Sequence, residues 1–283
     1  SLGIAQPTVQ KAINQLERDA ACPLFDRTSH GMLATRECQS LANAARLAFV
    51  ELAQAEADLA EYSGREVGTI VVGALPFSLS YLLPVIATRF REKRPQMSVK
   101  VVHMPFFQLL AGLRRGEIDF LLGGLSDAAP DADIDQKTLF QDSLVLLARS
   151  DHPVTRKLSP ALEELAAYPW VVAPKSTPAH NYFEQLFAGV GEKISVSIVD
   201  TCSFELMREL LATSDHLGCI SMLQAAREVE RGNLKRLKVE AAQATWPIGV
   251  TTRSGWLATA SQREFLEIVA AVANDPFANS VSL

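Results

Sequence analysis

The strongest constraint on the fold is a regular alternation of strand-like and helix-like segments through most of the chain. Short apolar runs rich in Val, Ile and Leu are followed by amphipathic stretches with helical spacing. Strands are expected at 67–74, 98–103, 118–123, 143–149, 170–173, 194–199, 217–221 and 247–252, and helices at 79–93, 106–116, 160–167, 179–188, 204–212, 223–230 and 258–272. Strands that alternate with helices pair in parallel and form doubly wound sheets.

An acidic loop at 126–135 interrupts this alternation and separates two series of elements. We therefore expect two α/β lobes joined by two connecting strands, in a periplasmic-binding-protein-like arrangement over residues 67–283. Lobe I would comprise about 67–143 and 253–274, and lobe II about 150–246. The residues before 67 do not show this alternation of strands and helices. We therefore expect the whole chain to be an α+β multidomain protein.

Residues 6–17 predict an amphipathic helix with an unusual polar face. Its apolar side carries Val9, Ala12, Ile13 and Leu16, and its outer side carries Thr8, Gln10, Lys11, Asn14, Gln15 and Arg18. Amides and cations can pair with base edges and phosphates in a major groove. Gly3 suits the end of a preceding helix and Pro7 a first helical position, which indicates a helix-turn-helix. A surface helix with a polar outer face is the alternative.

The run 22–35 reads as a short apolar segment, a turn at 29–31 and a return strand, which together form a small β wing. Here the sequence resembles the LysR-type transcriptional regulators. The family pattern stands as Gln6-Pro7, Leu16-Glu17, Leu24-Phe25-Asp26-Arg27, Gly31 and Thr35. Within the family, residues 73–76, 115–119 and 123–125 look similar to the branch around the galactose-binding-protein regulator and the protocatechuate-pathway regulators.

The resemblance implies a partial winged helix-turn-helix over residues 1–38 that binds double-stranded promoter DNA. The DNA-binding residues it implies are Gln6, Pro7, Thr8, Gln10, Lys11, Asn14, Gln15, Arg27, Ser29 and His30. Family members usually carry Ser where Ala5 and Gln10 stand, and Gly where Cys38 stands. The family also begins with a complete first helix, so we expect the chain to be truncated and to bind DNA poorly by itself.

Residues 39–62 contain neither Pro nor Gly and predict a long helix. Its apolar seam comprises Leu41, Ala45, Ala48, Leu52, Ala55 and Leu59. Seams rich in Ala let two helices approach closely, which favours dimerisation over packing on a domain of the same chain. Residues 63–66 would be a hinge, and the resemblance implies a homo-oligomer, either a dimer or a homotetramer built from two kinds of dimer.

Ligands of open α/β sheets bind beyond the carboxyl ends of the strands, where helix N-termini offer free N–H groups. The candidate effector-binding residues at such junctions are Phe77, Ser78, Ser80, Phe106, Phe107 and Gly124 in lobe I and Thr201, Ser203 and Phe204 in lobe II. Their hydroxyl groups suit a sugar or an organic acid, and their rings suit an aromatic one. The alternatives are ordinary helix caps for the hydroxyls and core positions for the phenylalanines.

Composition narrows the function classes. The 283 residues are 48% hydrophobic and 21% charged, with a net charge of −5, and no run is apolar enough to span a membrane. Residues 1–40 carry four positive and four negative side chains, so the segment is neutral. The four cysteines (Cys22, Cys38, Cys202 and Cys219) lie far apart and suit free thiols in the reducing cytoplasm. We expect no metal and no cofactor.

Two other function classes share parts of this pattern. A solute-binding protein of a transport system would use the same two lobes, but it would lack residues 6–35 and carry a signal sequence. An enzyme is not favoured, because the sequence has no Gly-x-Ser-x-Gly elbow, phosphate loop or Gly-x-Gly-x-x-Gly motif. The sequence therefore predicts a regulator without enzymatic activity that senses a small metabolite between two lobes.

Overall fold

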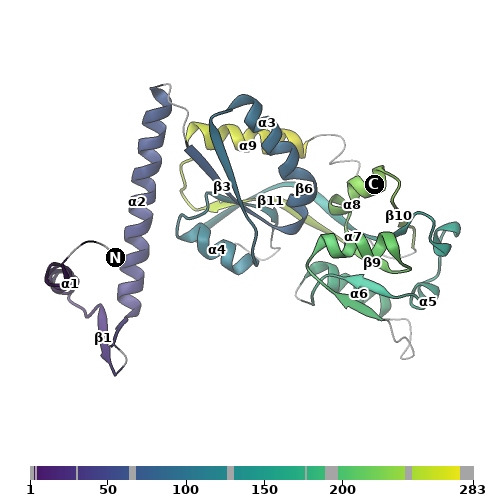
Figure 1. Cartoon of the computed structure of the whole chain (residues 1–283), viewed down its shortest axis with the longest axis horizontal. Helices are drawn as coiled ribbons and strands as arrows, with labels where there is room; N and C mark the ends of the chain where they lie inside the picture. Colours follow the sequence, from purple (N-terminus) through teal and green to yellow (C-terminus); the bar gives the residue numbers. More distant parts are fainter. Residues whose placement is uncertain are drawn as a thin grey trace. The chain divides into compact units, whose positions relative to one another are not determined.

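The computed structural model describes residue 3 and residues 5–29, 31–63, 68–125, 131–175, 177–188, 197–239 and 244–274. The chain divides into two compact units, Ser1–Leu59 and Ala60–Leu283, which we call the N-terminal and C-terminal units (Figure 1).

The N-terminal unit contains the helix and the wing that the sequence predicts. Helix α1 (Gln6–Ala20) starts with proline in its first turn and ends at Ala21, whose φ of 51° is left-handed. Strands β1 (Phe25–Thr28) and β2 (Gly31–Ala34) then pair antiparallel. Helix α2 (Arg36–Tyr62) follows and begins three residues before the predicted start.

Polar contacts and one buried leucine hold these elements together. Leu24 is buried, and its backbone N–H donates to Glu17 Oε1 at 2.8 Å. Thr35 Oγ1 accepts from the Cys38 N–H at 3.1 Å, which caps α2 and explains its early start. No residue of α1 is buried, and Leu16 on its apolar side is 47% exposed. Within this unit, the apolar face of α1 is therefore only partly covered.

The C-terminal unit is built on a nine-stranded mixed sheet in the order β4-β3-β5-β11-β6-β9-β7-β8, with β10 also paired to β6. The strands are β3 (Gly68–Ala74), β4 (Met97–Val102), β5 (Phe120–Gly124), β6 (Ile134–Arg149), β7 (Trp170–Val172), β8 (Ile198–Asp200), β9 (Leu217–Ser221), β10 (Leu234–Leu237) and β11 (Thr245–Arg253). The helical segments are η1 (Ser78–Leu82), α3 (Leu83–Lys93), α4 (Phe106–Arg114), η2 (Pro153–Arg156), α5 (Leu162–Leu165), α6 (Pro178–Phe187), α7 (Phe204–Thr213), α8 (Met222–Glu230) and α9 (Ala260–Ala273).

The sheet divides into two lobes that share strand β6. In lobe I, β3 pairs in parallel with β4 and β5, and in lobe II, β7 pairs in parallel with β8 and β9. The first part of β6 pairs with β11, and its last part pairs with β9 and β10. The two-lobed α/β prediction is confirmed, although β6, with 16 residues, is more than twice as long as the strand expected at 143–149. The predicted domain boundaries stay predictions.

Helices cover both faces of each lobe. In lobe I, α3 and α9 lie on one side of the strands and α4 on the other (Figure 1). The rings of Phe90 on α3 and Phe265 on α9 meet edge to face at 5.1 Å. In lobe II, Trp170 packs against Phe183 of α6, and Met207 of α7 lies in a second cluster. These layers fix the strand ends where the predicted ligand residues stand.

The predicted helix at 79–93 is two segments. A π-helical turn over Ser78–Leu82 precedes α3, whose first turn contains proline. Pro84 has no N–H to donate to the preceding turn, so the backbone widens there. The predicted helix is thus confirmed as α-helix over Leu83–Lys93, and its first turn is π-helical.

A buried histidine in lobe II predicts a pH dependence of stability. His152 is fully buried, its Nδ1 accepts from the Val154 N–H at 3.1 Å, and its ring packs on Tyr168. Burial lowers the pKa of His152, and the nearby Asp215 opposes this shift. In the unfolded chain the same imidazole has its ordinary pKa near 6.5. Below this pH the unfolded chain therefore binds a proton that the buried imidazole of the folded protein does not bind.

We therefore expect the free energy of unfolding to fall as the pH drops through and below about 6.5. Urea unfolding of the parent and of His152→Asn at neutral and mildly acidic pH would measure this. The variant should lose less stability than the parent over that pH interval. An equal loss in both proteins would assign the pH dependence to other groups.

Candidate functional site

The predicted DNA-binding residues of α1 lie on an exposed, hydrogen-bonded face. Gln10 Nε2 donates to Asn14 Oδ1 at 2.9 Å, and Gln15 bridges Arg18 and Asp19 through contacts of 2.6 and 2.8 Å. The predicted residues Gln6, Pro7, Thr8, Gln10, Lys11, Asn14 and Gln15 are all exposed. This face is thus accessible, and hydrogen bonds between its side chains hold the amides in place. Their contacts with bases stay a prediction.

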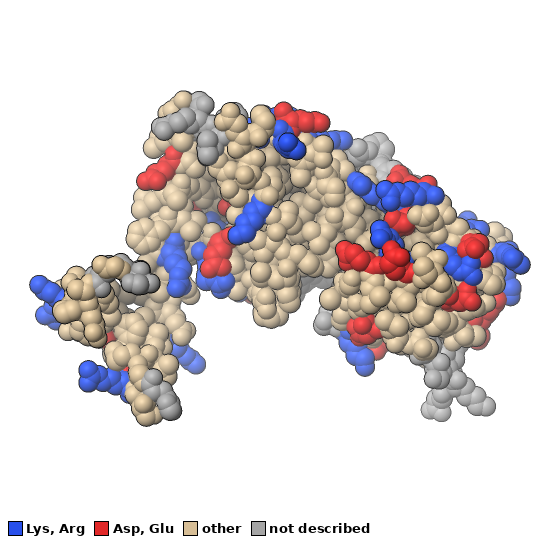
Figure 2. Space-filling model, in the orientation of Figure 1, with Lys and Arg blue, Asp and Glu red and all other residues tan. Residues whose placement is uncertain are grey.

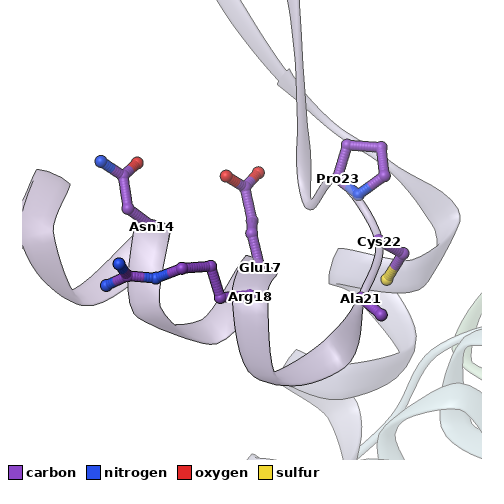
Figure 3. Close-up of a pocket in the computed structure, with 6 residues that line it drawn as sticks. All are labelled: Asn14, Glu17, Arg18, Ala21, Cys22 and Pro23. Carbon is purple, nitrogen blue, oxygen red and sulfur yellow. The ribbon is translucent and has the colours of Figure 1, made fainter.

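A shallow hollow of about 550 Å³ lies at the end of this face. Figure 3 shows Asn14, Glu17 and Arg18 projecting from α1, with residues 21–23 closing the other side. The hollow contains one cation, Arg18, and one carboxylate, and that carboxylate already accepts the Leu24 N–H. It therefore offers no net positive charge to a phosphate.

The wing presents its turn to solvent. Arg27 on β1 and Ser29 after it are exposed, and Gly31 has a φ of 123°, a backbone conformation that L side chains rarely adopt. His30 lies outside the described residues. The positions of Arg27 and Ser29 suit a contact with the DNA backbone beside the groove, which stays a prediction.

The first predicted effector junction brings Phe77 and Gly124 together. The Phe77 ring lies 6.1 Å from Trp246, and a Cβ built at Gly124 would approach the Phe77 ring to 3.2 Å. Ser78 is fully buried, and its hydroxyl donates to the Leu75 carbonyl at 2.7 Å. Ser80 is half-buried. Ser78 therefore has a local role here, and ligand contact by these residues stays a prediction.

The second junction is more open. Phe107 is 69% exposed and Phe106 40%, which excludes the core alternative for both rings. His103 is exposed, and its Nδ1 lies 2.9 Å from the Ala74 carbonyl at the end of β3. This contact fixes the imidazole beside the junction after β3.

The lobe II junction precedes α7. Thr201 Oγ1 accepts from the Ser203 N–H at 3.1 Å, and Ser203 Oγ caps α7 by accepting from the Leu206 N–H at 3.2 Å. Ser203 also donates to Glu205 at 2.9 Å, and Phe204 packs partly against a lobe II core cluster. Thr201 and Ser203 are half-buried caps, as the alternative interpretation allowed.

One electrostatic interaction connects the junctions of the two lobes. The pKa of Glu205 is held low by its own backbone N–H and by Ser203, with further contributions from Arg208 and from His103 of lobe I. A second contact across the lobes places the Arg227 guanidinium of α8 5.8 Å from the Tyr81 ring of η1. The contact of Arg227 with Tyr81 thus joins a helix that follows β9 in lobe II to the turn that follows β3 in lobe I.

Sequence reasoning did not select the residues at the crossover between lobes. Trp246 on β11 lies beside Phe77, and its indole N–H is buried without a partner among the described residues. Its strand partner Asp142 is buried and accepts from Ser143, Leu223 and Ser221. Burial raises the pKa of Asp142, whereas these donors lower it. Neither residue stands at the carboxyl end of a strand, where the candidate residues were sought, so no motif marked them.

Two kinds of site are absent from the part of the chain that the structure describes. No group of three or more His, Cys, Asp or Glu side chains there is placed to hold a metal ion. No helix there is both long enough and apolar enough to cross a bilayer.

The two parts of the chain match two models of one family. Residues 63–274 match the LysR substrate binding domain, and residues 1–39 match the bacterial regulatory helix-turn-helix protein, lysR family. The two-lobed domain behind a helix-turn-helix segment is thus that of a ligand-responsive regulator. The chain belongs to the LysR family of transcriptional regulators, as the sequence analysis predicts.

Individual relatives agree with this assignment. The chain is 33% identical to the transcriptional regulator GalR of Pseudomonas putida over 255 residues, which cover 90% of this chain and 64% of GalR. A variant of full-length OxyR from Pseudomonas aeruginosa has the same fold, with a TM-score of 0.67 and 20% identity over 96% of this chain and 86% of that one. Full-length CbnR in complex with its target DNA has a TM-score of 0.56, 19% identity and coverage of 96% and 92%.

Proposed function

We propose that this chain is a transcriptional regulator that binds promoter DNA through α1 and the wing, and binds a small metabolite between its lobes. The observation that carries the second part is the contact between the lobes in which the Arg227 guanidinium of α8 lies 5.8 Å from the centre of the Tyr81 ring of η1. Segment η1 follows β3 and α8 follows β9, so this contact lies beyond strand ends, where α/β sheets bind ligands. A ligand seated there would contact both lobes and favour one relative arrangement of them.

The metabolite that these junctions suit is a sugar, an aromatic acid or another organic acid. Phe106 and Phe107 offer exposed rings, and Thr201 and Ser203 offer hydroxyl groups. His103 can donate to a carboxylate or accept from a sugar hydroxyl. The ligand is bound and released without reaction, since the relatives of this chain are regulators.

DNA binding would use the exposed amides and cations of α1 in a major groove. The related CbnR was solved with its target DNA, which supports this role for the matching helix-turn-helix. A protein that binds a promoter acts in the cytoplasm of a bacterium. The transport alternative is disfavoured, because the match over residues 1–39 has no use in a solute receptor.

Oligomer formation would use α2. Four large apolar side chains of this helix are exposed, and Phe49 is the most exposed of them at 71%. They are Leu41, Phe49, Leu52 and Leu59. Pairing two such helices would bury this surface in a dimer, and the dimers could assemble further into a tetramer.

A thermal-shift screen tests the effector site. Sugars, sugar acids, aromatic carboxylates and amino-acid derivatives would be screened against the parent, Thr201→Val and Thr213→Val. A ligand at about a hundred times its Kd stabilises the folded state by about 2.7 kcal/mol, which raises the Tm of a unit this size by several degrees. We expect this shift in the parent.

The two threonines make a matched pair, because they stand at opposite ends of α7 and each forms a local hydrogen bond. Thr213→Val should keep the shift, and Thr201→Val should lose at least half of it. Equal shifts in both variants would remove Thr201 from the site. Ligand binding that persists when either lobe's junction residues are replaced would contradict the site between the lobes.

A further inference from the structure

A hollow at the far end of lobe II concentrates positive charge. It has a volume of about 240 Å³ and lies between the turn after β6 and the edge strand β10. Its lining residues are Thr155, Arg156, Lys157, Leu158, Lys235, Arg236, Leu237 and Lys238. Five of these eight residues are cations and none is acidic, in a chain whose net charge is −5. In Figure 2, both blue and red side chains lie at this end of the lobe.

The first wall of the hollow is a rigid turn. Thr155 is buried, and its hydroxyl donates to the carbonyls of Ser150 and His152 at 3.0 and 2.7 Å. Val154 is buried beside it, and the Lys157 N–H donates to the Val154 carbonyl at 3.2 Å. This packing fixes the backbone that presents Arg156 and Lys157.

The second wall is strand β10, which pairs antiparallel with β6. Leu234 and Leu237 are buried and hold the strand in the lobe, whereas Lys235 and Lys238 are exposed. Lys235 Nζ donates to the Thr155 carbonyl at 3.0 Å and so connects the two walls. Both sides of the hollow are therefore held in place before any ligand binds.

Few carboxylates offset this charge. Glu164 of α5 pairs with Lys157 at 2.7 Å. Among the described residues, Arg156, Arg236 and Lys238 have no ion pair. Like charges this close repel one another across a hollow that partly excludes water, so a bound anion would relieve that repulsion.

Protection of a sheet edge does not account for the cluster. Lysines on or beside an edge strand discourage pairing with other chains, which explains Lys235 on β10 and Lys238 directly after it. That role needs no cations on the facing turn, yet Arg156 and Lys157 stand there. Cations from two separate segments around one concave space are what anion binding requires.

We propose that this hollow binds the phosphate groups of a small, multiply charged anion. A single carboxylate brings one negative charge to this cluster, whereas adjacent phosphates bring two to four and accept several charge-assisted hydrogen bonds. None of the lining residues is aromatic, so the site recognises phosphates and not a stacked base. It is separate from the junctions between the lobes and does not depend on the function proposed for them.

Titration of the whole chain with inorganic diphosphate tests the proposal. Isothermal calorimetry at low ionic strength should show saturable binding at one site, which weakens as salt is added. The double variant Arg156→Gln/Lys238→Gln removes one cation from each wall, and neither side chain forms a hydrogen bond among the described residues. It should bind diphosphate at least about tenfold more weakly, because charge-assisted contacts are worth that much each.

The control is Arg91→Gln/Lys100→Gln, which removes the same two residue types from exposed positions of lobe I. It should bind diphosphate as the parent does. Equal weakening in both double variants would mean non-specific attraction and overturn the proposal, as would the absence of saturable binding to the parent. Displacement of diphosphate by duplex DNA of arbitrary sequence would assign the hollow to DNA backbone and overturn the small-molecule assignment.

Discussion

Replacement of Gly249 by alanine is expected to lower the free energy of unfolding of the C-terminal unit by about 3 kcal/mol or more. A Cβ at this position would stand 2.2 Å from the Lys137 carbonyl oxygen and 2.6 Å from Leu125 Cδ1. The carbonyl belongs to β6, which is paired with β11 at this point, so it cannot retreat without breaking the ladder. Urea unfolding would measure the loss.

Gly68→Ala is the matched control. Its added Cβ would meet only the flexible end of Met97, at 3.1 Å from Cε, and that side chain can turn away. We expect a change within about 1 kcal/mol for this variant. A similar loss in both variants would mean that any glycine replacement in these strands is harmful, and that the close approach at Gly249 is not the cause.

Lys11→Glu is expected to reduce promoter binding by roughly two orders of magnitude. Lys11 is exposed in the middle of α1, on the face that carries Gln10, Asn14 and Gln15. The substitution removes a phosphate or base contact and adds a negative charge that the DNA backbone repels, at a cost of about 1–3 kcal/mol. Because the segment 1–40 is neutral, each cation has few others to compensate its loss.

Fluorescence anisotropy with a labelled promoter fragment and the full-length protein would measure this loss of DNA binding. Lys100→Glu makes the same charge change on β4 of the C-terminal unit and should leave DNA binding within about twofold of the parent, because Lys100 is not among the predicted DNA-binding residues and distant exposed charges are screened by salt. The assignment of α1 to the groove fails if both variants bind promoter DNA equally well.

The alternation of strands and helices was readable because each element repeats one pattern. Strand β9 lies at the predicted residues, and α7 and α4 begin at the predicted residues. The first part of β6 was missed because residues 135–138 are all polar or charged and follow an acidic loop. Strand β10 was missed because it has four residues, two of them cations. Their pairing with neighbouring strands fixes both segments, and sequence patterns do not record such pairing.

The site was less readable than the fold. The topology alone predicts which residues follow strand ends, and it therefore identifies Phe77 and Gly124, which the structure brings together. Burial could not be read from the same positions, and Ser78 is enclosed with its hydroxyl already bonded. Trp246 was overlooked, because its place beside Phe77 depends on the register between β11 and β6. DNA contacts of α1 remain predictions from its exposed side chains.

The shared strand β6 determines how the lobes can move. It runs without interruption from Ile134 to Arg149, and β11 lies beside its first part with a register shift at Ile248 and Gly249. Two paired strands resist stretching and sliding, because either would break hydrogen bonds, but they accept a change of twist, most readily at a bulge. A ligand between the lobes would therefore twist this pair of strands. Ligand binding should then change the angle between the two lobes and not the distance between them.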